Sequence, residues 1–207
     1  MILKAKHHRV IYPLFKLLTH FLLKRKFQVI HTIGDFDDPG KPVLVIANHI
    51  SWWDGFWLMY LNLKRIHRKV HFMMLEEQLK KHWYFQFTGG FSVKKKSRSL
   101  IESLNYTLEL LSDPHNMVFI FPQGEIQSQH NNTITFEQGV QRIVEKLTDE
   151  IQVVFVANLL DYFSHPKPGL YMYIETHNSQ QLKHCSVESK YSIFYNNALS
   201  KQKNIRS

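Results

Sequence analysis

Apolar residues along the chain gather in short continuous runs, and amphipathic stretches of about ten or more residues separate these runs. The runs predict strands over residues 27–31, 42–47, 69–75, 91–93, 117–121, 151–159 and 169–176. The amphipathic stretches predict helices over residues 51–63, 76–87, 98–111, 136–147 and 187–199. Strands that alternate with helices are typical of an α/β fold, and we expect a mixed, mostly parallel sheet layered with helices.

An amphipathic stretch precedes this region, between Val10 and Phe27. Apolar side chains at helical spacing share one face of it: Leu14, Leu17, Leu18, Phe21 and Leu22. Lys16 and His20 interrupt the apolar residues, so the stretch is too short to cross a bilayer as a helix. It is not typical of a cleaved signal peptide either, because no small-residue cleavage site follows. The helix either lies in a membrane interface, where its lysines reach lipid phosphates, or packs on the domain's own core.

The length of 207 residues suits one globular unit with a sizeable core. The sequence contains no internal repeat and no long linker. We therefore predict an amphipathic N-terminal membrane-interface helix at residues 1–26 and a single α/β domain at residues 27–207. The tryptophans are compatible with a membrane interface or with a core: Trp52, Trp53, Trp57 and Trp83.

The composition excludes several classes of protein. With 44% hydrophobic and 21% charged residues the chain is not disordered, and one cysteine, Cys185, excludes a disulfide framework or a cysteine-rich metal site. Lys and Arg number 26 against 17 Asp and Glu, a net charge of +9. This charge favours a polyanionic partner, which is nucleic acid, an anionic membrane surface or a phosphate-bearing substrate.

Candidate chemistry follows the predicted strand at residues 42–47, since the carboxyl ends of strands carry catalytic groups in open α/β sheets. His49 is a candidate general base, and Asp54 is a candidate carboxylate that holds the ring and stabilises the imidazolium. The same residues allow a second interpretation. Ser51-x-x-Asp54 resembles a capping box, in which Asp54 only caps the start of a helix.

The segment Asn48-His49-x-x-x-x-Asp54 resembles the first signature block of the glycerolipid acyltransferase family, which includes the 1-acylglycerol-3-phosphate acyltransferases. Three more segments resemble later blocks of that family, in the right order: Gly89-Gly90-Phe91-Ser92-Val93-Lys94-Lys95, Phe121-Pro122-Gln123-Gly124 and Phe136-x-x-Gly139. The predicted strand around residues 153–157 stands where the fourth block lies, without its usual proline. The resemblance spans residues 42–160 and implies an α/β acyltransferase domain.

The sequence also departs from the family pattern. Gln123 replaces the usual glutamate of the third block, Glu125 stands at the threonine position, and Ile126 replaces the arginine. In the family these later blocks are associated with the glycerol phosphate of the acceptor. The candidate substrate-binding residues are therefore Asn48, Lys94, Lys95, Arg98, Gln123, Gly124 and Glu125. For the lysines a solvated turn is an equal alternative, and for Gln123 and Glu125 a role in shaping a turn.

The resemblance implies a reaction in phospholipid biosynthesis. An acyl thioester, either acyl-CoA or acyl carrier protein, is the co-substrate, and a hydroxyl of a lysophospholipid or a related lipid alcohol is the acceptor. His49 takes the hydroxyl proton and Asp54 orients His49. The expected partners are this donor, the lipid acceptor and a membrane surface but no nucleic acid, with the enzyme peripheral or monotopic on the cytoplasmic face of a membrane.

No cofactor or metal is implied. Several histidines lack carboxylate or cysteine partners at ligand spacing, and we expect them at the surface or in loops: His7, His8, His67, His71 and His165. Two alternatives to acyl transfer remain. One is a non-catalytic basic module that binds anionic lipid or nucleic acid, although no nucleic-acid motif is present. The other is a thioesterase that uses the same His49 and Asp54 with water as acceptor.

Overall fold

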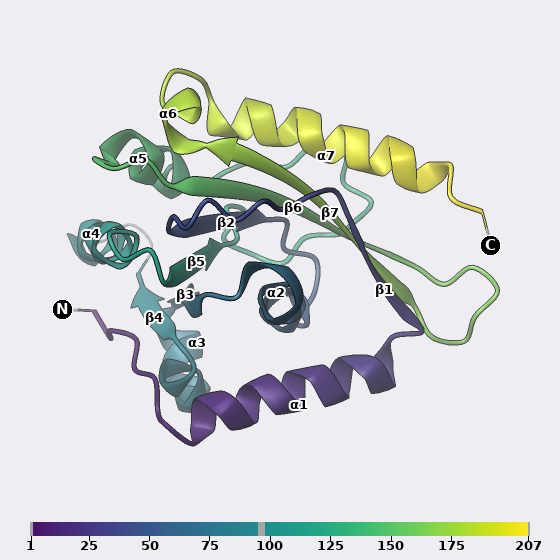
Figure 1. Ribbon diagram of the computed structural model, residues 1–207, viewed down its shortest axis with the longest axis horizontal. Coiled ribbons are helices and arrows are strands. Elements are labelled where there is room, and N and C mark those ends of the chain that lie inside the picture. The colour runs from purple at the N-terminus through teal and green to yellow at the C-terminus, as the bar shows by residue number, and fades with distance from the viewer. Residues whose placement is uncertain (1, 95–97, 207) are drawn as a thin grey trace.

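The computed structural model describes residues 2–94 and 98–206, in which seven strands form one sheet (Figure 1). The strands are β1 (Val29–Ile33), β2 (Val43–Ala47), β3 (Lys69–Leu75), β4 (Gly90–Val93), β5 (Asn116–Ile120), β6 (Gln152–Asp161) and β7 (Gly169–Asn178). Their order across the sheet is β1-β7-β6-β2-β5-β3-β4. Neighbouring strands are parallel except for the antiparallel pair β6 and β7. The prediction of a mixed, mostly parallel sheet is confirmed.

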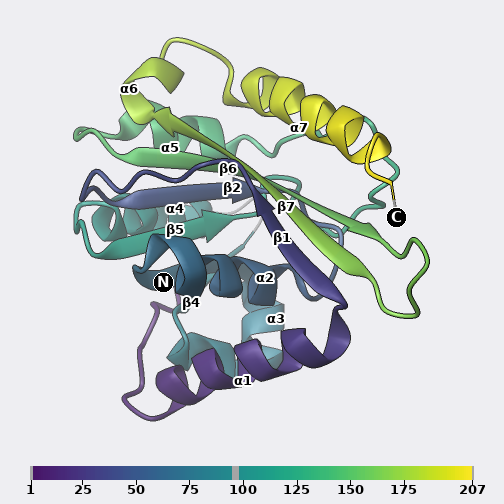
Figure 2. The same ribbon diagram turned by 45° about the vertical axis from the view of Figure 1, so that its right-hand side comes forward.

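Helices cover both faces of this sheet, as Figures 1 and 2 show. One face carries α1 (Ile11–Lys26), α2 (Asp54–Leu61) and α3 (Glu76–Lys81). The opposite face carries α4 (Arg98–Leu110), α5 (Gly139–Lys146) and α7 (Val187–Lys203), and the short helix α6 (Ser179–Leu182) follows β7. The predicted layering of helices on the sheet is therefore confirmed.

Strand β2 lies at the centre of the sheet, and all five of its residues are buried. Val43, Val45 and Ala47 belong to the core beneath α1 and α2. Leu44 and Ile46 belong to the core beneath α4, α5 and α7. Alternate residues of a strand point to opposite faces, so a strand covered on both faces is apolar throughout. Because β5 and β6 are parallel to β2, the residues that follow all three strands meet at one edge of the sheet.

The helix predicted over residues 76–87 is shorter in the structure. Helix α3 ends at Lys81, and a 3₁₀ turn, η2 (Trp83–Phe87), follows. Phe85 in this turn is buried, and its ring centroid lies 5.9 Å from that of Phe72 in β3. Packing of Phe85 against the sheet therefore fixes a tighter turn than the continuous apolar pattern predicts.

The helix predicted over residues 51–63 also ends in another geometry. Helix α2 stops at Leu61 and continues as a π-helical turn, η1 (Asn62–Ile66). The Asn62 side chain accepts a hydrogen bond from the Arg68 N–H and donates one to the Arg68 carbonyl oxygen, both at 2.9 Å. These bonds close the short connection into β3, which the helical periodicity does not predict.

The helix predicted over residues 136–147 starts three residues late, at Gly139. The Glu137 N–H donates to the carbonyl oxygen of Pro122 at 2.8 Å, and the Phe136 ring packs against Tyr191 of α7 at 5.4 Å. The segment before α5 is therefore held against the loop that follows β5 and does not join the helix.

Helix α1 packs one face on the domain and exposes another. On the packed face, the Phe15 ring lies 5.3 Å from Phe56 of α2, and Leu23 is fully buried. On the other face lie four of the five apolar side chains of the predicted face, with exposed fractions given in parentheses: Leu14 (60%), Leu17 (67%), Leu18 (44%) and Phe21 (59%). The helix does contact the domain's own core, but the described residues leave this apolar face uncovered. No described helix is long and apolar enough to cross a bilayer.

The segment before α1 is tied to the far edge of the sheet. The Ser92 N–H of β4 donates to the carbonyl oxygen of Leu3 at 2.9 Å. His7 reaches inward, where its Nε2 lies 2.9 Å from the carbonyl oxygen of Val70 and its ring centroid 4.7 Å from that of His71. His71 is only 3% exposed, so our expectation of a surface or loop position is wrong for this residue. It is buried because β3 is an interior strand, covered on both faces.

Acid should destabilise the protein through these imidazoles. Burial lowers the pKa of His7 to about 4 and that of His71 to about 3, and the positive charge of Lys69 adds to both shifts. An unfolded histidine titrates near pH 6.5, so below that pH the unfolded chain binds more protons than the folded one. Between pH 6.5 and 5 we expect His71 alone to lower the free energy of unfolding by about 2 kcal/mol.

Urea unfolding at pH 7, 6 and 5 measures this effect. In the His71→Gln variant the free energy of unfolding should fall less steeply with decreasing pH than in the wild type. His165→Gln, a change in an exposed loop, is the control and should keep the wild-type slope. Equal slopes in the wild type and His71→Gln would contradict the prediction.

Candidate active site

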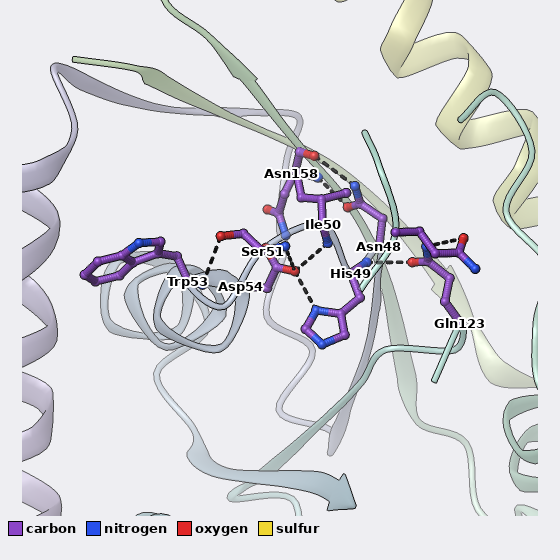
Figure 3. Close-up of polar contacts among 9 residues, drawn as sticks. Asn48, His49, Ile50, Ser51, Trp53, Asp54, Gln123 and Asn158 are labelled. Atoms are coloured by element: carbon purple, nitrogen blue, oxygen red, sulfur yellow. Dashed lines mark hydrogen bonds and ion pairs between the residues drawn. The ribbon is translucent and has the colours of Figure 1, made fainter. Parts of the chain in front are cut away.

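His49 and Asp54 come together at the carboxyl edge of the sheet. His49 follows β2, and Asp54 is the first residue of α2, which turns back beneath the sheet. Nδ1 of His49 lies 2.6 Å from Oδ2 of Asp54 (Figure 3). The Asp54 side chain is fully buried and that of His49 is 23% exposed. Nε2 of His49 has no hydrogen-bond partner among the described residues, so this nitrogen is open to an incoming molecule.

The Asp54 carboxylate also organises the turn that contains His49. Its Oδ2 accepts hydrogen bonds from the N–H groups of Ile50 at 2.7 Å and Ser51 at 2.9 Å, and the Ser51 hydroxyl accepts from the Trp53 N–H at 3.1 Å (Figure 3). The structure therefore contains both arrangements that the sequence allowed. Oδ2 of Asp54 binds the N–H groups of the turn that leads into α2, and the same oxygen atom holds the imidazole.

Burial raises the pKa of Asp54 above its ordinary value. The hydrogen bond and charge of His49, and then the N–H groups of Ser51 and Ile50, oppose this rise. The second oxygen, Oδ1, is buried without a hydrogen-bond partner among the described residues. In such a water-poor environment a carboxylate interacts more strongly with a positive charge that forms beside it, and an imidazolium at His49 is such a charge.

An aromatic ring supports the imidazole from the next strand. Phe121 directly follows β5, and its ring stacks on His49 with centroids 4.2 Å apart and an angle of 12° between the ring planes. Phe121 covers one face of the imidazole while Asp54 binds its Nδ1. Together they fix the plane of the ring and the direction of Nε2.

The predicted substrate-binding residues Asn48 and Gln123 are buried beside His49. Asn48 donates to the carbonyl oxygen of Asn158 at 2.9 Å and accepts from its N–H at 2.7 Å. Gln123 accepts from the His49 N–H at 2.6 Å. Both side-chain amides thus bind main chain, Asn48 that of Asn158 within β6 and Gln123 that of His49 after β2 (Figure 3).

The remaining predicted residues of the third block shape the loop after β5. Gly124 has a φ of +68°, a conformation that glycine adopts without strain, and its N–H donates to the carbonyl oxygen of Phe121 at 3.1 Å. Glu125 is exposed and accepts from the Gln127 side chain at 3.2 Å. Sequence reasoning did not identify Gln127, whose N–H donates to the His49 carbonyl oxygen at 2.9 Å. Nothing in its sequence context marks it.

The predicted phosphate-binding residues lie farther along the same edge. Lys94 follows β4, and strands β5 and β3 lie between β4 and β2. Three interstrand spacings therefore separate the chain at Lys94 from the end of β2, a distance of about 14 Å. Its ammonium lies 3.3 Å from Oε1 of Glu76, which also pairs with Lys80 at 2.6 Å. The hydrogen bond from Lys80 and then that from Lys94 lower the pKa of Glu76.

Lys95 lies outside the described residues, as does the side chain of Arg98. Glu76 directly follows β3, and the carboxyl-end rule could have identified it.

Other surface features lie away from this pair. A groove of about 670 Å³ between α5 and the connection from α6 to α7 is lined by charges of both signs, including Arg142, Glu145 and Lys183. It opens on the face of the sheet opposite α2. Within residues 2–94 and 98–206, no three His, Cys, Asp or Glu side chains are grouped as metal ligands.

A protein-family model described as Acyltransferase matches residues 24–158, more than half of the chain. The matched region contains β2, the His49 and Asp54 pair, the loop after β5 and most of β6. No curated protein sequence matches the chain.

Proposed function

The chain belongs to the acyltransferase family, and from this premise we propose that it transfers a fatty acyl group from an acyl thioester to a hydroxyl of a lysophospholipid or a related lipid alcohol. The donor is acyl-CoA or acyl carrier protein, and no further cofactor takes part. One observation carries the proposal. His49 Nδ1 is bound by buried Asp54 at 2.6 Å, while Nε2 faces outward without a partner among the described residues.

The proposed reaction uses this imidazole twice. The acceptor hydroxyl gives its proton to Nε2 of His49 while its oxygen attacks the carbonyl carbon of the thioester. Nδ1–H donates to Asp54, whose charge stabilises the imidazolium. The tetrahedral intermediate then collapses, the carbon–sulfur bond breaks, and the departing thiolate takes the proton from Nε2. An ester and a free thiol result, without a covalent bond to the protein.

For an acceptor that bears a phosphate, we propose that Lys94, Lys95 and Arg98 attract this group. The ion pair of Lys94 with Glu76 would then be exchanged in part for the phosphate. The loop after β5, which carries the third block, offers no cation for the phosphate. Ile126 occupies the position of the family's arginine and is 53% exposed. Whether the acceptor bears a phosphate therefore depends on the cations of the second block and the residue that follows it, Lys94, Lys95 and Arg98.

We propose that the enzyme is peripheral on the cytoplasmic face of a membrane and docks through α1. The uncovered face of α1 presents Leu17 and Phe21 near the basic end of the helix, where Lys24 is exposed. Trp52 and Trp83 are also exposed, at 54% and 61%, as expected of residues that enter an interface. In contrast, Trp57 is fully buried and is a core residue.

An assay with a panel of acceptors tests the proposed activity. Purified protein is incubated with palmitoyl-CoA or palmitoyl acyl carrier protein and with lysophosphatidic acid, other lysophospholipids or phosphate-free lipid alcohols, and products are identified by mass spectrometry. Acylated acceptor supports the proposal. Free fatty acid without acylated acceptor supports a thioesterase instead, and binding to anionic vesicles without either product supports a non-catalytic module.

Vesicle binding should depend on the uncovered face of α1. The double variant Leu17→Glu, Phe21→Glu should bind vesicles of phosphatidylglycerol and phosphatidylcholine at least tenfold more weakly than the wild type, because two exposed apolar side chains are lost and negative charge is added. Ile193→Glu is the matched control, since Ile193 is 61% exposed on α7, on the opposite face of the sheet. Flotation measures the bound fraction. Equal binding of the wild type and the double variant would contradict this mode of docking.

A further inference from the structure

The ladder of hydrogen bonds between β2 and β5 ends before it reaches His49. The last paired residues of the two strands are Ile46 and Ile120. Beyond this point the loop after β5 continues to hold the chain. Its Gln123 side chain accepts from the His49 N–H at 2.6 Å, and the Gln127 N–H donates to the His49 carbonyl oxygen at 2.9 Å. Both main-chain polar groups of His49 are thus bound from the same side.

The orientation of the Gln123 amide is itself determined. Its Nε2 donates to Oε1 of Gln127 at 2.9 Å, and Nε2 of Gln127 donates to Oε1 of Glu125 at 3.2 Å. An ionised carboxylate only accepts hydrogen bonds, so Gln127 must direct its NH₂ group toward Glu125 and its oxygen toward Gln123. Gln123 in turn must direct its NH₂ group toward Gln127. This series of hydrogen bonds directs Oε1 of Gln123 toward the His49 N–H. Gln123 is 6% exposed, so water does not readily replace this contact.

We propose that Gln123 is a positioning residue for acyl transfer, which holds the main chain of His49 so that the imidazole lies between Phe121 and Asp54. The inference rests on the proposed function, because it assigns Gln123 a part in that reaction. It also assigns the residue a role other than contact with the acceptor. Both polar atoms of its side chain bind groups within the protein, Oε1 the His49 N–H and Nε2 the Oε1 of Gln127.

Glutamate, the usual residue of the third block at this position, would change the charge beside His49 without removing the hydrogen-bond acceptor. Asp54 of α2 is the carboxylate that binds the imidazole, and Glu125 is two hydrogen bonds away from Gln123. The buried Tyr191 hydroxyl of α7 donates to the carbonyl oxygen of Val156. A carboxylate at position 123 would accept the same hydrogen bond from His49 but would add a negative charge near the ring. That charge favours the imidazolium, so the unprotonated imidazole that acts as base forms only at a higher pH. An apolar side chain of the same length would instead leave the His49 N–H without an acceptor.

Three variants test the proposal by steady-state kinetics across pH. Gln123→Met should lower kcat by about 10- to 100-fold, with KM changed less than about threefold, because the base is misplaced while the substrate still binds. Gln123→Glu should restore kcat to within about threefold of the wild type, while the acid limb of the pH–rate profile moves up by about one pH unit. Gln129→Met is the matched control with wild-type kinetics. Gln129 lies in the same loop but binds the main chain of Leu160.

A nuclear magnetic resonance titration separates this inference from the proposed function. The imidazole signal of His49 is identified by its absence in His49→Ala. This signal should titrate at higher pH in Gln123→Glu than in the wild type. The titration requires no substrate, so the result does not depend on knowing the acceptor. An unchanged midpoint, or wild-type kcat in folded Gln123→Met, overturns the positioning role. If Gln123→Met does not fold, Gln123→Glu decides, and a loss of kcat at all pH values without a moved limb also overturns it. An inactive wild type whose His49 midpoint still responds to position 123 contradicts only the assigned reaction.

Discussion

Replacing His49 with alanine should lower kcat for acyl transfer by about 10²- to 10⁴-fold, the range that a positioned general base contributes. The alanine variant keeps the main-chain hydrogen bonds to Gln123 and Gln127, because they use the N–H and carbonyl groups of residue 49. It loses the contact with Phe121 and leaves Asp54 with two main-chain donors. The loss should therefore fall on catalysis and not on the fold.

Mass-spectrometric product formation and far-ultraviolet circular dichroism check this prediction together. His130→Ala is the control, since His130 is an exposed histidine in the loop after β5 and takes no part in the site. It should retain wild-type kcat. Turnover by folded His49→Ala at the wild-type rate would rule out His49 as the base and leave the proposed mechanism without a proton acceptor.

Replacing Asp54 with asparagine should lower kcat by about 10²- to 10⁴-fold for a different reason. The side chain keeps its size and can still accept from the Ile50 and Ser51 N–H groups, but it no longer carries the charge that stabilises the imidazolium. Asp54→Ala is a poorer test, because two main-chain donors would lose their acceptor, at a cost of about 1–3 kcal/mol each.

We also expect Asp54→Asn to affect the thermal stability of the protein. Burial raises the pKa of Asp54, so the folded state holds this proton more tightly than the unfolded state. The stabilisation by the protonated form is complete at low pH and is lost as the pH rises through the folded-state pKa. At pH 7 the variant avoids the cost of a buried charge, and we expect its Tm to equal or exceed that of the wild type.

Thermal unfolding and the acyl-transfer assay, run on the same preparation, measure both effects. Asp35→Asn is the control, since Asp35 is exposed in the loop after β1, and it should change neither Tm nor kcat. An Asp54→Asn variant with wild-type kcat would show that the carboxylate only holds the turn before α2.

Much of the fold could be predicted from local sequence patterns. The five buried residues of β2 form a continuous apolar run, and such a run fixes both a central strand and the point at which it ends. Because chemistry in open α/β sheets gathers at that point, His49 and Asp54 could be identified as a pair. Helix boundaries were less predictable where packing overrides periodicity, as at Phe85, which turns the chain into the core after α3.

The apolar face of α1 shows where sequence reasoning ends. Its spacing showed that Leu14, Leu17, Leu18 and Phe21 share a face, but not what covers that face. The structure uses another face of the helix, with Phe15 and Leu23, to contact the domain. A helix that is apolar on two faces satisfies the same periodicity in either orientation, so only the packing of α2 decided which face is buried.

The sequence by itself determined the alternation of strands and helices, the end of β2, and the nature of the groups that follow it, because these depend on residues a few positions apart. Only the tertiary structure decided that Gln123 binds the main chain of His49, that Glu76 pairs with Lys94, and that His71 is buried. Each of these depends on the order of strands in the sheet. Strand order is set by how the whole chain buries its apolar faces, and residues far apart in sequence become neighbours only after that choice is made.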